Sequence, residues 1–424
     1  MGTFAALAVF GLIFFSLYQA SVTDEAPGYG ERVVIWGTLS REAFYSVFNE
    51  IIKEDRDFQS VQYVAKDSRS FDLDLLTAIA EGNSPDLVVL RSDSLVTHRS
   101  KLRAISYESI SERTFRDTYV DGAEIYMLSD GVYGLPFAVD PLMMYWNRDL
   151  FSSNGLANPP RTWEELVGVT EPAITEVSTD LRISKSAIAF GEYSNIRNAK
   201  NILSLLLLQS GTDVVVENDR GYEITLNQNA QPGLPPGDAS LSFYTQFANP
   251  AGTEYTWNRS LPQDRLQFAG GDLALYFGLG SEYGSIEGSN PNLNFDITQV
   301  PQGSGASVKR GFGIYYAFAI PRASTNPQGA WRVAQVLSGE AVSADLASAL
   351  NLAPVHRVEV DRGSSDPYRQ SLYTAALIAR AWLDPDALTS ENVIKVMIED
   401  VTSGRMRVSQ AVTDAIGRLQ LLFK

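Results

Sequence analysis

The sequence predicts an α/β protein made of two doubly wound lobes that follow a membrane-spanning segment. Three observations lead to this fold class. Short apolar strands alternate with amphipathic helices along most of the 424 residues, which is typical of doubly wound sheets. The roughly 400 residues after the first two dozen exceed what one hydrophobic core usually supports. The first 22 residues carry no charged side chain.

Composition excludes several classes of site and partner. Hydrophobic residues make up 45% of the chain and charged residues 20%, as in a globular protein. The net charge is −16 and no Lys/Arg-rich run occurs, so we expect no nucleic-acid partner. The chain has no cysteine and only two histidines, His98 and His356. We therefore expect no disulfide, no metal and no cofactor.

The amino-terminal segment predicts a membrane anchor. About 20 apolar residues are enough to cross a bilayer as a helix, and residues 1–23 are rich in phenylalanine, leucine and other apolar side chains. The only positive charge at its start is the amino terminus, and Tyr18 occupies a place where a cleavage site prefers a small residue. We favour an uncleaved anchor over a cleaved signal, with residues 24–31 as a linker. The bulk of the chain would lie outside the membrane.

Strands and helices alternate directly after the linker. Residues 32–36, 61–64 and 86–90 are short apolar runs, typical of buried parallel strands. Between them, apolar residues at helical spacing follow Ser40 and Ser70, each of which can cap a helix start. Strand, helix, strand, helix, strand is the order of a doubly wound sheet.

The later chain continues this alternation. Thr162 and Glu165 predict a capping box, in which each side chain binds the other residue's free amide. Residues 199–208 predict a helix that is buried on most sides. Three further helix starts are predicted at Asn326 before Pro327, at Ser390 and at Ser409.

Four blocks of sequence resemble a known family in order and spacing. They are residues 82–88 (GNSPDLV), residues 133–166 with YGLPF, MMYWNRDLF and PPRTWEEL, residues 270–278 (GGDLALYFG), and residues 313–321 followed by Asn326-Pro327 and Ala330-Trp331. Together they resemble the family 1 extracellular solute-binding proteins, the maltose-binding-protein-like sugar receptors of ABC importers. Trp146 is inserted between the tyrosine and asparagine of the family pattern, and Arg148 replaces the usual lysine.

The resemblance implies a fold similar to that of type II periplasmic binding proteins, with several hinge crossovers between the lobes. Lobe 1 would contain residues 32–139 and 302–352. Lobe 2 would contain residues 140–301 and 353–424. Pro136 and Gly134 would hold the first crossover in a non-helical path.

The resemblance also implies a function. The protein would capture a sugar or oligosaccharide by hinge closure outside the cell or in the periplasm, and would deliver it to the permease subunits of an ABC importer. It would be a monomer tethered to the membrane and would not be an enzyme.

Candidate ligand-binding residues follow from the rule that open α/β sheets bind ligands beyond the carboxyl ends of their strands. Aromatic faces can stack on the C–H faces of a sugar, and charged groups can bind its hydroxyls. The residues selected in this way are Trp36, Ser40, Arg91, Asp93, Asp140, Glu192, Tyr193, Trp257, Tyr276, Glu282, Tyr283 and Tyr315. Trp146, Trp163 and Trp331 are expected to pack in the core, and His98 to be a solvated surface residue.

Two other classes of function stay open. A secreted glycosidase needs two carboxylates beside the scissile bond, and the 50 acidic residues guarantee candidate pairs without identifying one. A receptor for polyamine, iron or another non-sugar solute is the second alternative. The adjacent Tyr315 and Tyr316 could not hold one iron ion, because neighbouring residues of a strand point to opposite faces.

Overall fold

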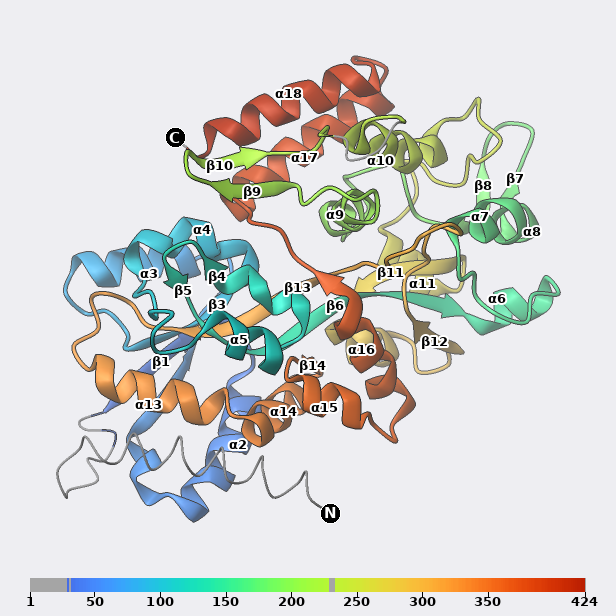
Figure 1. Cartoon of the computed structure of the whole chain (residues 1–424). Helices are drawn as coiled ribbons and strands as arrows, with labels where there is room; N and C mark the ends of the chain where they lie inside the picture. Colours follow the sequence, from blue (N-terminus) through green and yellow to red (C-terminus); the bar gives the residue numbers. More distant parts are fainter. Residues whose placement is uncertain (1–28, 30–31, 229–232, 424) are drawn as a thin grey trace.

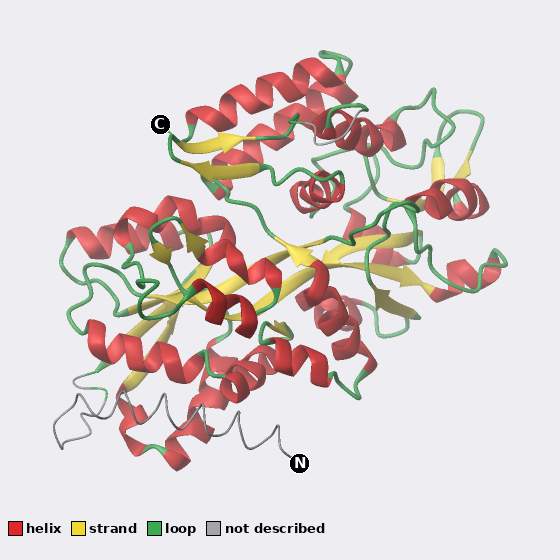
Figure 2. Cartoon of the chain, in the orientation of Figure 1, coloured by secondary structure: helices red, strands yellow, loops and turns green. Residues whose placement is uncertain are grey.

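The computed structural model describes residue 29, residues 32–228 and residues 233–423. The predicted anchor and most of the linker lie outside the described residues. Within the described ranges, no helix combines the length and apolar character needed to cross a bilayer. A mixed sheet of 11 strands runs through the molecule. Eight of them follow the order β2-β1-β3-β13-β6-β11-β8-β7, while β12 and β14 pair with β6 and β15 pairs with β13. Helices cover both faces of this sheet, as predicted for a doubly wound fold (Figure 1, Figure 2).

Lobe 1 is built on three parallel strands, β1 (Val33–Gly37), β2 (Val61–Ala65) and β3 (Leu87–Arg91). All three were predicted within one or two residues. Helix α2 (Arg41–Glu54) follows β1, and the Ser40 hydroxyl accepts the amide of Ala43, as predicted. Helix α3 (Phe71–Ala80) follows β2, but Ser70 makes no capping bond, because its backbone is already helical and its hydroxyl turns to Asp74.

Short elements complete the first part of lobe 1. They are helices α4 (Leu95–His98) and α5 (Glu112–Thr118), the 3₁₀ helix η4 (Asp121–Tyr126), and strands β4 (Met127–Leu128) and β5 (Gly131–Val132). The side chain of Tyr126 joins this layer to the sheet, since its hydroxyl donates to the carbonyls of Leu90 and Tyr315, both at 2.8 Å. The layer of η4, β4 and β5 therefore lies directly against β3 and β13.

Strand β6 (Leu135–Asn147) connects the two lobes and is buried along nearly its whole length. Its first half pairs with β13 (Gly311–Ala319) and β14 (Ala353–Pro354), and its second half pairs with β11 (Leu273–Leu279) and β12 (Phe295–Thr298). Strand β13 returns beside it in the opposite direction. The crossovers near residues 140 and 302 stay a prediction; β6 contains residue 140, and β13 begins after residue 302, at Gly311.

Lobe 2 surrounds the second half of β6. Its elements up to β12 are helices α6 (Arg148–Ser153), α7 (Trp163–Glu165), α8 (Glu171–Ile174), α9 (Ala199–Gln209), α10 (Pro236–Thr245), α11 (Asp264–Gly270) and α12 (Tyr283–Ser289), and strands β7 (Glu176–Val177), β8 (Ile183–Ile188), β9 (Val215–Asn218) and β10 (Gly221–Ile224). The predicted capping box is half formed. Thr162 accepts the amide of Glu165, but the Glu165 carboxylate accepts the amide of Arg161.

The return to lobe 1 adds helices α13 (Pro327–Leu337), α14 (Glu340–Ala349) and α15 (Arg357–Arg362), the last packing on α14 and α5. Asn326 caps α13, as predicted. Helix α16 (Pro367–Ile378) lies across the junction and contacts β6, β13 and β12. Strand β15 (Ala379–Arg380) pairs with β13 and leads to lobe 2, where α17 (Ala387–Thr402) and α18 (Val408–Leu421) end the fold.

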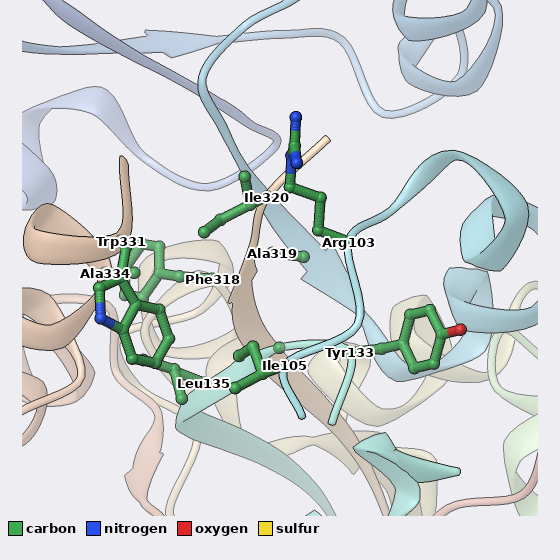
Figure 3. Close-up of a pocket in the computed structure, with 10 residues that line it drawn as sticks. Arg103, Ile105, Tyr133, Leu135, Phe318, Ala319, Ile320, Trp331 and Ala334 are labelled. Carbon is green, nitrogen blue, oxygen red and sulfur yellow. The ribbon is translucent and has the colours of Figure 1, made fainter. Parts of the chain in front are cut away.

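The core of lobe 1 is aromatic. The rings of Phe44 and Tyr63 stack at 3.8 Å, and those of Phe137 and Phe318 stack at 4.6 Å. A small cavity of about 10 Å³, enough for one water molecule, lies in this lobe near Trp331 and Leu135 (Figure 3). It is too small for a sugar, so it does not compete with the junction between the lobes as a binding site.

Candidate binding site at the junction of the lobes

The carboxyl end of β3 presents an ion pair toward lobe 2. Arg91 is the last residue of the strand, and its guanidinium binds Asp93 through two hydrogen bonds of 2.9 and 2.6 Å. Burial is the largest single influence and raises the pKa of Asp93, but the charge and hydrogen bonds of Arg91 and the charge of Lys200 together outweigh it and hold that pKa below its usual value. Asp93 is therefore an ionised carboxylate at the lobe junction, in the place where the sequence predicts it.

Asp140 on β6 joins the crossover to lobe 2. Its carboxylate accepts the amide of Ser281 at 3.0 Å and the hydroxyl of Ser281 at 2.6 Å. Only 2% of Asp140 is exposed, and this burial raises its pKa to about 6. Asp140 thus holds Ser281 of lobe 2. Asp140 and Pro141 both lie within β6, so the alternative interpretation of Asp140 as a turn residue does not apply.

The structure brings together two of the predicted residues in lobe 2, Tyr276 and Glu282, but in a buried network with Asn198. Asn198 donates to Glu282 at 2.9 Å, and the Tyr276 hydroxyl donates to the same carboxylate at 2.6 Å. Tyr276 has no exposed surface. We therefore assign Tyr276 and Glu282 to the support of the β11–α12 turn, which positions Ser281, and no longer to direct ligand contact.

Glu192 and Tyr193 follow β8, as predicted, and each has a partner. The Glu192 carboxylate takes two hydrogen bonds from Arg259, at 3.2 and 3.1 Å. The Tyr193 hydroxyl donates to Glu391 of α17 at 2.9 Å. Tyr193 is half-buried, whereas Glu192 is 5% exposed.

The structure places two predicted aromatic residues in the core. Trp257 has no exposed surface, and its indole N–H donates to Asn195 at 3.1 Å. Tyr315 is equally buried, with its hydroxyl on the carbonyl of Ala379 at 2.9 Å. Because neither ring has a free face, we correct the expectation that they stack on a ligand. Burial of this kind depends on tertiary packing, which strand-end position does not reveal.

The remaining predicted residues are accessible. The Trp36 ring is half-buried and carries the Lys66 ammonium at 3.7 Å from its centre. The Tyr283 ring is also half-buried and lies 4.5 Å from that of Tyr368. Ser40 is exposed and its hydroxyl is already used to cap α2. Of these, Trp36 and Tyr283 keep surface that could contact a sugar.

Sequence reasoning missed the charged group that faces Asp93 from lobe 2. The Lys200 ammonium, on the first turn of α9, donates to Asp384 at 2.6 Å and to Ser390 at 2.7 Å. Burial raises the pKa of Asp384, and Lys200 opposes that rise. The Lys200 charge also contributes to lowering the pKa of Asp93. The only sequence signal was Asp384 itself, an acidic residue that follows Trp382-Leu383 and precedes Pro385.

Tyr316 is a second residue that the rule of strand ends does not select. It lies opposite Arg91 in the β13–β3 ladder, and burial raises its pKa, while the Arg91 charge opposes this effect. Tyr315 and Tyr316 do point to opposite faces, since the former contacts Ala379 and the latter is an electrostatic neighbour of Arg91 and Asp140. Tyr316 therefore lies on the same face as Arg91 and Asp140, with 5% of its surface exposed.

The prediction that His98 is a solvated surface residue is wrong. Its side chain is fully buried, and its Nε2 lies 2.6 Å from the Asp72 carboxylate. Within the described part of the chain no group of three histidine or acidic side chains is placed to hold a metal ion.

The comparisons with known proteins place this geometry in a family. The profile of the family described as bacterial extracellular solute-binding protein matches residues 49–370. A putative binding protein of Brucella abortus (strain 2308) is 22% identical over 338 residues, which are 78% of this chain and 76% of that protein.

Solved structures share the fold. A cyclo/maltodextrin-binding protein in complex with maltotetraose superposes with a TM-score of 0.73 at 16% identity, over 94% of this chain and 98% of that one. An ABC-transporter solute-binding protein of Thermotoga lettingae, bound to α-D-tagatose, has a TM-score of 0.67 at 19% identity, over 93% and 100% of the two chains. The fold is thus that of the type II periplasmic binding proteins, and the chain belongs to the bacterial extracellular solute-binding protein family.

Proposed function

We propose that the protein captures a sugar or oligosaccharide between its two lobes and delivers it to the permease of an ABC importer. One observation carries this proposal. Arg91 binds Asp93 at the end of β3, Asp140 of the crossover binds Ser281 of lobe 2, and the charges of Lys200 and Arg91 act on Asp93 and Asp140 respectively. Hydroxyl-rich ligands need this mixture of charged donors and acceptors. The structural neighbours bind maltotetraose and tagatose, which supports a carbohydrate as the ligand class.

The proposed binding residues are revised from the sequence-based set. Arg91, Asp93, Asp140 and Tyr316 would line the lobe 1 side, and Lys200 and Tyr193 the lobe 2 side. Trp36 and Tyr283 would offer aromatic surface at the edges of the site. The other six residues of the sequence-based set would support the fold and position these side chains; they are Ser40, Glu192, Tyr276, Glu282, Trp257 and Tyr315.

We also propose two lobes with the bounds given above, apart from the last crossover. Helix α15 packs on α14 and α5, and β15 pairs with β13 beside the end of β3. The chain would therefore pass to lobe 2 after residue 380 and not at residue 353. Hinge closure would then bend β6, β13 and the segment that follows β15.

The family places the protein outside the cytoplasm, and we propose that residues 1–23 tether it to the membrane as a single-pass anchor. Residues 24–31 would form the spacer between anchor and lobe 1. The protein would act as a monomer, since a receptor that presents both lobes to a permease needs those surfaces free.

Calorimetry on residues 29–424 tests the ligand class. Maltotetraose, mannotriose and tagatose are the sugar probes, and spermidine and ferric citrate represent the non-sugar alternatives. We expect at least one sugar to bind and to lower the radius of gyration in small-angle scattering, because ligand binding stabilises the closed lobes. Binding of spermidine or iron in place of every sugar would contradict the proposal.

The same material separates a receptor from a glycosidase. Maltotetraose and mannotriose are incubated with the protein and their lengths are followed by chromatography over a day. A receptor leaves both oligosaccharides intact. Shorter products that disappear in an Asp140→Asn variant would show that the junction carries out hydrolysis, and the proposal would fail.

A further inference from the structure

Two segments of the chain lack acidic residues, although the chain as a whole is rich in them. The sequence has 50 acidic residues and a net charge of −16. Residues 94–107 and 297–339 nevertheless contain no aspartate or glutamate. The later part of the first segment pairs with the loop that follows β13 in the second, at the bridge between Leu102 and Pro321. A cation on either paired segment therefore has no acidic neighbour along its own chain.

The pairing brings three cations together in lobe 1. The Arg103 amide donates to the Ile320 carbonyl at 2.8 Å, and the Arg322 amide donates to the Lys101 carbonyl at 2.7 Å. The guanidinium groups also bind carbonyls, Arg103 that of Arg322 at 3.0 Å and Arg322 that of Leu102 at 2.8 Å. Among the residues that the structure describes, none is an acidic partner of these cations. We call Lys101, Arg103 and Arg322 the basic patch.

The basic patch keeps most of its hydrogen-bond donors available. Arg103 and Arg322 are exposed, and Lys101 is half-buried. A guanidinium has five N–H donors, and here each one donates to a single carbonyl. Figure 3 shows the Arg103 guanidinium extending away from the residues that surround the small cavity. Arginine side chains bind phosphate groups through two parallel N–H bonds, so the patch has the chemistry of a phosphate-binding surface.

The basic patch lies at the end of lobe 1 that is opposite the proposed sugar site. Asp86, directly before β3, accepts the hydroxyl of Ser324 at 3.0 Å, and Ser324 follows Arg322 by two residues. Arg91 and Asp93 stand at the other end of β3. The loop between β13 and α13 lies at the end of lobe 1 away from lobe 2 (Figure 1). The patch is therefore separate from the junction of the lobes.

The chain enters lobe 1 at this same end. The carbonyl of Tyr29 accepts the side-chain amide of Asn326 at 3.0 Å. The ring of Tyr29 packs edge-on against that of Phe58, with 5.4 Å between the ring centres. Residues 24–28 alone separate Tyr29 from the proposed anchor at residues 1–23. A stretch of this length spans at most about 17 Å, so an anchored chain keeps this end of lobe 1 close to the bilayer.

We propose that the basic patch docks lobe 1 on the anionic phosphate groups of the membrane surface. This inference rests on the proposed anchor, which brings the patch within reach of the lipids. Near an anionic surface, each lysine or arginine raises the population at the membrane about fivefold. The rest of the acidic chain is repelled, so the attraction acts at one end only and sets the orientation. The sugar site then faces away from the bilayer, toward incoming ligand.

Such docking is weak enough to reverse. Salt screens exposed charges, with a Debye length of about 8 Å at physiological ionic strength. Lobe 1 can therefore leave the lipids when the receptor meets its permease. The patch would orient the ligand-free receptor for capture, without taking part in sugar binding.

Fluorescence quenching of the full chain in vesicles tests the docking. Because the chain has no cysteine, Ala323→Cys and Thr179→Cys each provide one exposed site for a fluorophore, beside the patch and at the turn between β7 and β8. Nitroxide groups on lipid headgroups quench fluorophores close to the bilayer. We expect stronger quenching at position 323 in vesicles of equal parts phosphatidylglycerol and phosphatidylcholine than in pure phosphatidylcholine, and no such difference at position 179. About 1 M salt should abolish the difference.

Charge variants separate the patch from the net charge of the chain. The patch variant combines Lys101→Gln, Arg103→Gln and Arg322→Gln. It should lower the ratio of docked to undocked receptor about a hundredfold, since each cation contributes about fivefold. The control variant makes the same change at three cations of lobe 2, which are Arg220, Lys395 and Arg407. It should keep the quenching at position 323, and an equal loss in both variants would overturn the docking.

Flotation with the vesicles separates this inference from the proposed anchor. Equal quenching at position 323 in both kinds of vesicle would overturn the docking, even if the chain floats with both and the anchor is confirmed. A chain that floats only with the anionic vesicles, and loses this in the patch variant, would support the patch and overturn the anchor. A chain that floats with neither kind would overturn both.

Discussion

The Asp140 carboxylate receives both the amide and the hydroxyl of Ser281, at 3.0 and 2.6 Å, across 141 positions of sequence. Asp140 lies in the middle of the crossover strand, and Ser281 lies in the turn that follows β11. One buried side chain thus fixes how the first crossover meets lobe 2. This contact is the most direct place to test how the junction is held.

Asp140 should make stability depend on pH. Burial raises its pKa to about 6, above the value of about 3.9 for an unfolded aspartate. The folded state therefore binds this proton more tightly, and the stabilising contribution is full below about pH 4 and is lost as the pH rises through 6. Asp140→Asn should remove about 2 kcal/mol of the decline in the free energy of unfolding between pH 4 and 7. Urea unfolding across that range measures it. Parallel pH profiles for the two proteins would contradict the assignment.

Trp257 and Trp36 should respond differently to truncation. Trp257 is fully buried, so Trp257→Ala should cost about 3–5 kcal/mol of unfolding free energy through the cavity it leaves. Trp36 is half-buried at the edge of the proposed site, so Trp36→Ala should weaken sugar binding by about 1–3 kcal/mol with a smaller effect on stability. Urea unfolding and calorimetry on both variants distinguish the two roles. Equal losses of stability would show that Trp36 is also a core residue.

Tyr315 and Tyr316 form a matched pair for testing the two faces of β13. Tyr316→Phe should weaken sugar binding by about 1 kcal/mol, because it removes a hydroxyl beside Arg91 and Asp140. Tyr315→Phe should leave affinity within about twofold and should cost about 1 kcal/mol of stability, since the hydroxyl donates to the Ala379 carbonyl. Calorimetry and thermal unfolding read both effects. The reverse pattern would mean that the sugar site lies on the Tyr315 face.

Lys200 and Asp384 should depend on each other. Asp384 is 1% exposed, so Lys200→Met leaves an uncompensated buried carboxylate and should destabilise the protein by about 3–5 kcal/mol. The double variant Lys200→Met with Asp384→Leu should recover most of this loss, because neither charge then remains. Thermal unfolding of the three proteins measures the coupling. A double variant as unstable as the single one would show that Lys200 acts mainly through Ser390 or the Ala387 carbonyl.

The fold could be predicted from the sequence because it follows from local patterns. Strands β1, β2 and β3 are apolar runs of five residues, and the caps at Ser40, Thr162 and Asn326 form within four residues. Helix α17 was predicted to begin at Ser390, but it begins three residues earlier because Asp386 caps it. Such local errors leave the order of elements unchanged.

The site could be predicted only in part, because its contacts are long-range. The rule of strand ends found Arg91, Asp93 and Asp140. It could not find that Lys200 meets Asp384, 184 positions away. The same rule could not tell that Trp36 stays accessible whereas Trp257 is buried. The packing of the whole lobe decides this, and the position of a residue near a strand end does not reveal it.

Strand β6 has a consequence for how the protein is made. Its 13 residues are the central strand of the first lobe at one end and of the second lobe at the other. A gene fragment that stops before residue 135 deprives lobe 1 of an inner strand, and one that starts after residue 147 does the same to lobe 2. Lobe 1 also needs β13, which follows the strands of lobe 2 in the chain, so its sheet cannot be completed during synthesis until those strands have been made.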